Sequence, residues 1–174
     1  MIRNVKYLFL TLLLTLTLSA HAQKCPHDLR PAPKTYLGEE YVARHLEKFK
    51  DGVSCLSPSD VMRLYKQLGR ADGLFVMPKS EVDDLLKRTG GDVSKIEKEL
   101  GIPAGKWTER IENGNQLMRF DINKENLKDL RMSTGNESGA NEEWLPGGYT
   151  PRGNSEAVID AVDWKDVVQT IIKK

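Results

Sequence analysis

The sequence predicts an α+β domain in which short helices come first and a small, mainly antiparallel sheet follows. Two observations support this prediction. Apolar residues at helical spacing, in runs separated by glycines, dominate positions 39–101. From position 116 onward the pattern changes to short alternating or β-branched segments, which are typical of strands. No internal repeat is present, so a single core is expected.

Four helices are expected in the first half of the chain. The first covers residues 39–49. The second begins at Ser57-Pro58-Ser59-Asp60, because Ser57 can cap a helix and Pro58 fits its first turn, and its apolar stripe continues to Leu68. The third and fourth begin near Ser80 and at Asp92. The glycines expected to end the four helices are Gly52, Gly69, Gly90 and Gly101.

Strands are expected at residues 74–77, 116–122 and 157–162, with a shorter strand-like piece at 130–132. The segment 163–172 fits a strand or a short helix, and its β-branched residues favour the strand. Residues 102–115 have the pattern of a loop anchored by Trp107. Arg119 would be costly on a central strand unless its charge is paired, so we expect it at a sheet edge or in a cleft.

The first 22 residues have the three parts of a secretory signal peptide. A basic start with Arg3 and Lys6 precedes an uncharged run at 7–18, and Ala20-His21-Ala22 has the form of a cleavage site. The run is too short to span a bilayer, and no other apolar stretch is long enough. We therefore expect one domain at residues 23–174 in the periplasm or outside the cell, with no membrane span.

The charge balance argues against a nucleic-acid partner. The chain has 26 Lys and Arg against 25 Asp and Glu, and the predicted signal peptide holds two of the basic residues and no acidic one. A net charge near zero gives no broad basic surface for nucleic acid. No metal site is expected, because the cysteines and histidines are few and lack ligand spacing, and no bound cofactor is expected.

Cys25 and Cys55 both follow the predicted signal peptide, and two cysteines in an exported protein most simply form a disulfide. This bridge would tie the irregular N-terminal segment to the start of the helix expected after residue 57. Loop-closure entropy gives it about 3–4 kcal/mol of stabilisation. The alternative is a catalytic cysteine paired with His27 or His45, although neither cysteine lies in a nucleophile-type motif.

Residues 133–154 form a long Gly-rich loop without periodicity. Loops of this length in a compact domain are usually functional or disordered, and Trp144 and Tyr149 give this one apolar groups to anchor on a core. Its glycines permit positive φ angles or close approach of the backbone to a ligand. We expect a ligand-binding loop that delivers Glu156, at its exit, to a cleft. A surface loop that only connects two strands is the alternative.

Three segments carry a resemblance to a known family. They are DGLFVMPKSEVDDLLKRTGGDVSKIEKELGIPAG at 72–105, LMRFDI at 117–122 and RMSTGNESGANEEWLPGGYTPRGNSEAVID at 131–160. Together they resemble the C-terminal toxin domains of bacterial polymorphic toxins of the Rhs and contact-dependent type. The resemblance implies a toxin-like effector with an immunity protein as partner. The chain departs from that pattern in having its own signal peptide and a cysteine pair.

The order of segments is also similar, more distantly, to the NAD-glycohydrolase domain of secreted necrotising toxins. This likeness implies NAD or a related nucleotide as a small-molecule substrate, for hydrolysis or ADP-ribosyl transfer. Glu156 falls near the catalytic position, where a carboxylate would stabilise an oxocarbenium-like state. Arg119 is assigned to the catalytic pair, and Arg119 and Arg131 are the expected diphosphate contacts. The expected substrate-binding residues are Arg131, Asn136, Asn141, Trp144, Gly147, Gly148 and Tyr149.

Other interpretations of these residues stay open at this point. Glu156 would form a structural ion pair with an arginine if the loop is not a site. A small secreted nuclease would use His45, Glu156 and Arg119 as acid, base and cationic stabiliser. His45, next to Leu46 on the apolar face of the first helix, also fits a buried structural role. In a non-catalytic binding domain, Trp144→Ala would abolish function and Glu156→Gln would not.

Overall fold

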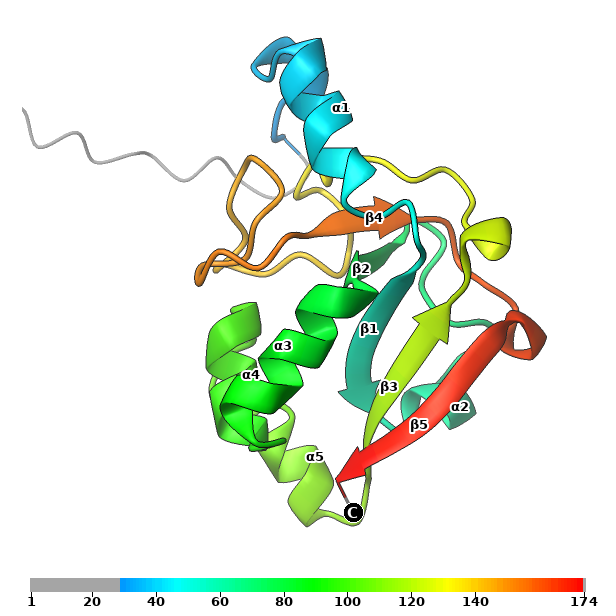
Figure 1. The fold of residues 1–174 in the computed structure, drawn as a ribbon. Helices are drawn as coiled ribbons and strands as arrows, with labels where there is room; N and C mark the ends of the chain where they lie inside the picture. Colours follow the sequence, from blue (N-terminus) through cyan, green and yellow to red (C-terminus); the bar gives the residue numbers. More distant parts are fainter. Residues whose placement is uncertain (1–28, 174) are drawn as a thin grey trace, which may run out of the picture.

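A computed structural model describes residues 29–173 of the chain and confirms the α+β class (Figure 1). The described part contains one five-stranded antiparallel sheet with the order β4-β2-β1-β3-β5. The strands are β1 (Val53–Pro58), β2 (Leu74–Pro78), β3 (Leu117–Ile122), β4 (Ala157–Ile159) and β5 (Val167–Lys173). The helices are α1 (Glu39–Glu47), α2 (Val61–Leu64), α3 (Lys79–Thr89), α4 (Val93–Leu100) and α5 (Thr108–Glu112).

The central strand β1 is the element that the sequence pattern did not predict. The helix expected from Ser57 to Leu68 was wrong. Ser57 and Pro58 end β1, the helix α2 has only four residues, and Leu68 pairs with Val162 in an isolated bridge. β1 pairs along its whole length with β3 and at its start with β2, so the ladder on both sides determines its conformation. Pro58 is tolerated because it occupies the last position of the strand.

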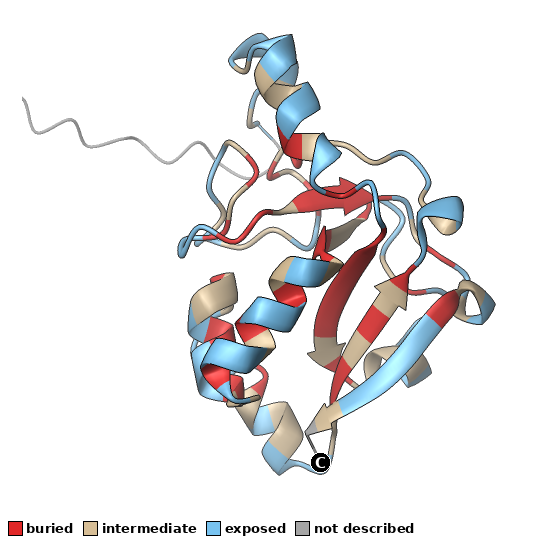
Figure 2. Ribbon diagram, in the orientation of Figure 1, coloured by how far each residue is buried: buried red, intermediate tan, exposed pale blue. Residues whose placement is uncertain are grey.

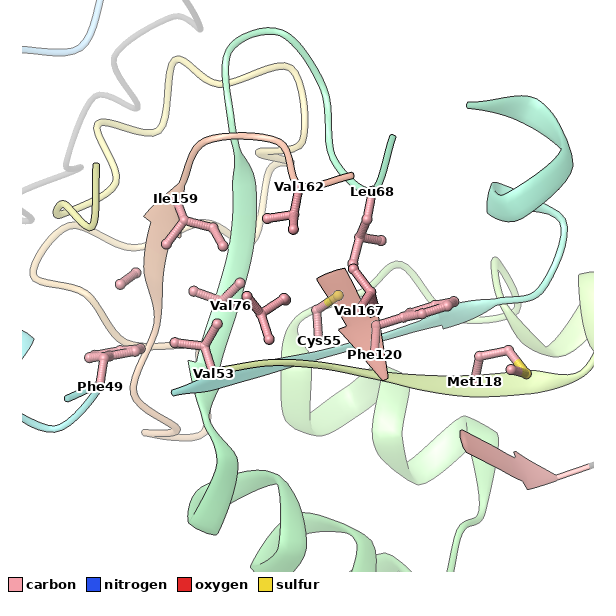
Figure 3. Close-up of a cluster of buried hydrophobic side chains, with 12 residues drawn as sticks. Phe49, Val53, Cys55, Leu68, Val76, Met118, Phe120, Ile159, Val162 and Val167 are labelled. Carbon is pink, nitrogen blue, oxygen red and sulfur yellow. The ribbon is translucent and has the colours of Figure 1, made fainter. Parts of the chain in front are cut away.

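The two faces of the sheet bury different cores, and Figure 2 shows that β1 is almost wholly buried whereas the edge strand β5 is largely exposed. α3 packs on β1 and β2, with α4 beside it, and the core beneath them contains Leu56, Met77, Val82, Leu85, Ile96, Trp107 and Leu117. The opposite face carries the larger core shown in Figure 3, which includes Phe49, Val53, Val76, Phe120, Ile122 and Ile159. Along β3, Met118, Phe120 and Ile122 face the larger core and alternate with Leu117, Arg119 and Asp121, as predicted. Of the second set only Leu117 belongs to the core beneath α3 and α4, and Arg119 and Asp121 are half-buried.

Several sequence predictions are confirmed at the level of single elements. α1, α3 and α4 lie where the periodicity placed them, and the Asp92 side chain caps α4 by accepting a hydrogen bond from the Lys95 backbone N–H. The segment after residue 163 is a strand, as its β-branched residues indicated. The expected loop 102–115 contains the short helix α5, and Trp107 is buried as predicted. The strand expected at 157–162 ends at Ile159.

Cys55 lies in the middle of β1 and not at a helix start, and its thiol is free and buried. Burial raises the pKa of this thiol to about 12, so it carries no charge at neutral pH. The structure therefore gives no support for the predicted Cys25–Cys55 disulfide at its Cys55 end. Cys25 and the predicted signal peptide 1–22 lie outside the described residues. Within residues 29–173, no helix is both long and apolar enough to cross a membrane.

Candidate active site

The Gly-rich loop covers a small pocket at the β4 side of the sheet, on the face that carries α3 and α4. Glu156 immediately precedes β4 and lies two residues from Val158, which pairs with Phe75 of β2. The alternation of strand side chains therefore puts Glu156 and Phe75 on the same face. We call this hollow the Glu156 pocket. It has a volume of about 90 Å³, and its walls include Phe75, Leu100, Ile102, Asn141, Trp144 and Tyr149.

Glu156 is a carboxylic acid in this pocket with a strongly raised pKa. Its side chain is half-buried, and no hydrogen bond to its carboxylate is found among the described residues. Burial raises its pKa to about 7, and the negative charge of Glu137 adds to the increase. Glu137 is buried too, but its carboxylate accepts hydrogen bonds from the backbone N–H groups of Thr134 and Gly135. Two nearby carboxylates thus have different environments, which is a common arrangement in acid–base sites.

Helix α1 holds the end of the Gly-rich loop in place with one row of side chains. The Tyr41 hydroxyl donates to the Gly147 carbonyl at 2.7 Å, and His45 Nε2 donates to the Glu156 carbonyl at 3.0 Å. One turn further on, Lys48 Nζ donates to the Tyr149 hydroxyl at 2.9 Å. These contacts orient the backbone of Glu156 and the ring of Tyr149 without using the Glu156 carboxylate.

His45 has the structural role that the sequence favoured. It is 3% exposed and packs among aromatic rings, and its Nδ1 has no hydrogen-bond partner among residues 29–173. Burial lowers the pKa of His45, and the positive charge of Lys48 lowers it further. The hydrogen bond to the Glu156 carbonyl acts in the opposite direction but is a smaller effect than burial. A neutral ring with Nε2 protonated fits these contacts. Its ring does not line the Glu156 pocket.

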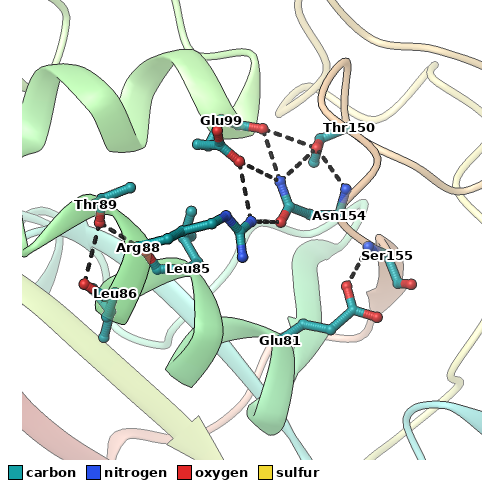
Figure 4. A network of polar contacts seen from close by, with 9 residues as sticks. All are labelled: Glu81, Leu85, Leu86, Arg88, Thr89, Glu99, Thr150, Asn154 and Ser155. Carbon is teal, nitrogen blue, oxygen red and sulfur yellow. Dashed lines mark hydrogen bonds and ion pairs between the residues drawn. The ribbon is translucent and has the colours of Figure 1, made fainter.

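Helices α3 and α4 hold the other part of the loop through the polar network in Figure 4. The carbonyl of Glu99 accepts hydrogen bonds from the Thr150 hydroxyl at 2.9 Å and from the Asn154 side chain at 3.0 Å. Arg88 contacts both Asn154 and the Glu99 carboxylate. The Ser155 backbone N–H donates to Glu81 of α3 at 2.6 Å. The loop is therefore attached to three helices as well as to the sheet.

The structure divides the predicted substrate-binding residues into two groups. Asn141, Trp144 and Tyr149 line the Glu156 pocket, whereas Gly147 and Gly148 supply backbone near it. Trp144 also donates from Nε1 to Ser133 and stacks beneath the Arg30 guanidinium at 4.7 Å. Asn136 does not line the pocket.

Asn136 has a different role, because it binds the chain segment ahead of α1. Its side-chain oxygen accepts from the Arg30 N–H at 3.1 Å, and its side-chain nitrogen donates to the Arg30 carbonyl at 2.9 Å. The Arg30 guanidinium contacts the Gly135 carbonyl as well. The residue thus fixes the described N-terminal segment against the loop.

Neither arginine assigned to the substrate lies in the Glu156 pocket. Arg119 is on β3 between two other strands, so the expected edge or cleft position was wrong. Its charge is paired with Asp83 and with Asp121 at 2.8 Å, which makes a half-buried arginine tolerable on a central strand. Arg131 is bound to Asp129 and Asp160 and donates to the Asp72 carbonyl at 3.0 Å. Both guanidinium groups are therefore already ion-paired with carboxylates of the protein.

Gly148 is a loop position where a side chain would collide with its neighbours. Its φ angle is +81°, and a Cβ there would lie 2.6 Å from both His45 Nε2 and Met132 Cε. Gly153 is a matched control, since its φ angle is +83° and a Cβ would meet nothing within 4 Å. We expect Gly153→Ala to cost about 1 kcal/mol of unfolding free energy from backbone strain. Gly148→Ala should cost about 3 kcal/mol, because overpacking adds to the strain.

Thermal and urea unfolding of the two variants beside the wild type would measure this difference. Equal losses would mean that the backbone conformation alone matters, and that His45 and Met132 do not press on Gly148.

Sequence reasoning missed two acidic residues and a basic hollow next to the Glu156 pocket. Glu137 and Glu97 are buried carboxylates. Glu137 lies in polar loop sequence without periodicity, whereas Glu97 lies on the apolar face of α4 at helical spacing with Val93, Ile96 and Leu100, which could have indicated its burial. The basic hollow contains Arg70 and Lys106, which come from turns with no recognisable motif. No group of three side chains suited to hold a metal ion is found among residues 29–173. No protein-family model matches the chain, and no curated protein is similar to it in sequence.

Proposed function

We propose that the protein is an exported, toxin-like effector that cleaves the nicotinamide–ribose bond of NAD or the equivalent bond of a related nucleotide. The observation that carries this proposal is the state of Glu156. It is a carboxylate whose pKa is raised to about 7 in a pocket walled by the rings of Phe75, Trp144 and Tyr149. A perturbed acid in a concave site with aromatic walls supports a catalytic role.

The cleavage reaction needs one general base and a negative charge close to the reacting carbon. As the C1′–N bond breaks, its electron pair goes to the nicotinamide ring, which leaves neutral because it began as a pyridinium cation. C1′ then carries positive charge, which an ionised Glu156 stabilises. Water adds to C1′, and Glu156 accepts the proton that water loses. A group with a pKa near 7 is well matched to this transfer at neutral pH. In ADP-ribosyl transfer, an acceptor on another molecule takes the place of water.

The nuclease alternative receives less support from the geometry. It would need His45, Glu156 and Arg119 around one substrate. His45 is enclosed by α1 and the loop, and Arg119 is ion-paired on β3. The binding-domain alternative remains distinct, because it predicts that Trp144 matters and Glu156 does not.

Two parts of the proposal rest on sequence alone. Export depends on the signal peptide predicted at residues 1–22. An immunity protein as partner depends on the resemblance of residues 36–160 to polymorphic-toxin domains. Neither part is needed for the reaction assay.

The experiment is nicotinamide release from NAD by purified protein, with and without a cell lysate as a source of acceptors. We expect release by the wild type, rising with pH to a plateau above pH 7 as Glu156 ionises. Glu156→Gln should lower the rate by about 100-fold or more, the usual loss for a group that stabilises transition-state charge. Glu143→Gln is the control, because Glu143 is an exposed carboxylate of the same pocket.

No release under either condition would overturn the proposed reaction. Release that Glu156→Gln leaves unchanged would remove Glu156 from it. Far-ultraviolet circular dichroism of each variant would show that a loss of rate is not a loss of fold.

A further inference from the structure

A second hollow opens beside the Glu156 pocket and has the opposite charge. It lies between α2, the turn at 69–74 and the segment 102–110, and we call it the Arg70 groove. Its volume of about 430 Å³ falls in the range of small-molecule sites. Its charged lining residues are Arg70, Lys106, Arg110 and Asp60, which leaves two net positive charges.

Two of these cations are available to a ligand. Arg110 donates two hydrogen bonds to Asp60, from Nε to Oδ2 at 2.9 Å and from Nη2 to Oδ1. By contrast, neither Arg70 nor Lys106 has an ion pair within the described part of the chain. Hydrogen bonds from Ser138 lower the pKa of Asp72, and the positive charge of Arg70 adds a smaller effect in the same direction, but Asp72 and Arg70 do not form an ion pair.

The groove and the Glu156 pocket meet at a shared wall. Phe75, Ile102, Gly139 and Asn141 line both hollows. At this wall Gly139 leaves room for the neighbouring side chains, since a Cβ there would lie 3.0 Å from the Phe75 ring and 3.6 Å from Arg70 Nη1. The Arg70 guanidinium thus lies where the basic groove passes into the acidic pocket.

The groove also offers an aromatic surface at its outer end. Tyr65 is 41% exposed there, and Trp107 forms part of the floor. A heterocyclic base can stack on an exposed ring of this kind. The groove therefore contains exposed aromatic surface and two cations without an ion pair in the described part of the chain, and it shares a wall with the pocket that contains Glu156.

We propose that the Arg70 groove binds the diphosphate of a nucleotide, with Arg70 and Lys106 as the phosphate contacts. A guanidinium fork and an ammonium group suit this role, since both donate charge-assisted hydrogen bonds to phosphate oxygens. The inference rests on the proposed function in one respect, namely that the rest of the same ligand enters the Glu156 pocket. The groove takes over the role that the sequence assigned to Arg119 and Arg131.

The test is calorimetric binding of ADP-ribose and of ADP to the purified protein. We expect Arg70→Ala and Lys106→Ala each to weaken binding of both ligands about tenfold or more, as for the loss of a charge-assisted hydrogen bond. Arg63→Ala is the matched control, because Arg63 is an exposed arginine of α2 that does not line the groove. It should leave the affinity unchanged, and so should Glu156→Gln for ADP, which lacks the second ribose.

The groove assignment is overturned if ADP-ribose and ADP fail to bind, or if they bind equally well to the wild type and to the double variant that combines Arg70→Ala with Lys106→Ala. Thermal unfolding would establish that the variants are folded. Binding through Arg70 and Lys106 without nicotinamide release would keep this inference and remove the proposed reaction. Nicotinamide release with an unaltered KM in the double variant would keep the proposed reaction and remove this inference.

Discussion

At pH 8, Glu156→Gln should be more stable than the wild type. Burial raises the pKa of Glu156 from 4.5 to about 7, so the folded protein holds the proton more tightly than the unfolded chain does. Below about pH 4.5 both states are protonated and the carboxyl group has no cost. Between pH 4.5 and 7 the unfolded state loses its proton first, and the stability of the wild type falls as pH rises.

Above pH 7 the whole penalty is present and amounts to about 3 kcal/mol at most. Gln has nearly the same shape and no charge, so it avoids the penalty. We expect the unfolding temperatures of the two proteins to agree near pH 4.5 and to separate by several degrees at pH 8. His45 acts in the opposite direction, because its lowered pKa costs stability at acid pH, but that effect is common to both proteins.

Thermal unfolding at half-unit steps from pH 4.5 to 8.5 would measure this separation. Glu143→Gln is again the control and should follow the wild type, since its side chain is exposed. Identical unfolding temperatures for wild type and Glu156→Gln at pH 8 would show that the Glu156 carboxylate is well solvated. Together with the loss of nicotinamide release, a gain in stability would mark Glu156 as a residue that the fold tolerates for the sake of activity.

Glu97→Gln should have the opposite effect and destabilise the protein by about 2–4 kcal/mol. Glu97 is 1% exposed, and its carboxylate accepts four hydrogen bonds. Three come from the Gly105 N–H at 3.1 Å and from the N–H and hydroxyl of Thr108, each at 3.0 Å, and the fourth comes from the Trp107 N–H. The side-chain NH2 group of Gln would face groups that are themselves hydrogen-bond donors, so some of these hydrogen bonds would be lost.

Urea unfolding at pH 7 would give the change in free energy. Glu112→Gln on α5 provides the control, because that side chain is exposed, and it should change stability by less than about 0.5 kcal/mol. A loss below 1 kcal/mol for Glu97→Gln would mean that the turn 101–107 rearranges without cost. Glu97 also matters for the Arg70 groove, because the turn 101–107 that it holds contains Lys106 and Trp107, which line the groove.

Sequence reasoning located the elements with clear local signals. α3 and α4 have apolar stripes that end at glycines in the left-handed conformation, and β3 alternates between apolar residues that face the larger core and partly polar residues on its other face. β1 gave no such signal. Its six residues contain two serines and a proline, and Ser57-Pro58-Ser59-Asp60 is a good helix start by local rules. Pairing on both sides in the centre of the sheet outweighs that local preference.

Within the candidate site, the position of residues in the Gly-rich loop predicted the pocket lining better than the positions of the arginines did. Chain order alone brings Trp144, Tyr149 and Glu156 together, because all three lie within one loop and the strand that follows it. Which arginines are free depends on partners distant in sequence. Arg119 and Arg131 are bound by Asp83 and Asp160, whereas the groove forms from three separate segments. Only the folded chain shows which arginines are ion-paired and which are not.

The strand order shows which distant parts of the chain the Glu156 pocket needs. β1 and β2 are neighbours in the chain and pair at the centre of the sheet, and they bring Phe75 into position. β4 pairs with β2 at one edge and comes from the far end of the chain. Glu156 and the Gly-rich loop immediately precede β4, so two walls of the pocket come from segments about 80 residues apart in the chain. A change that weakens the pairing of β4 with β2 would therefore separate Glu156 from Phe75.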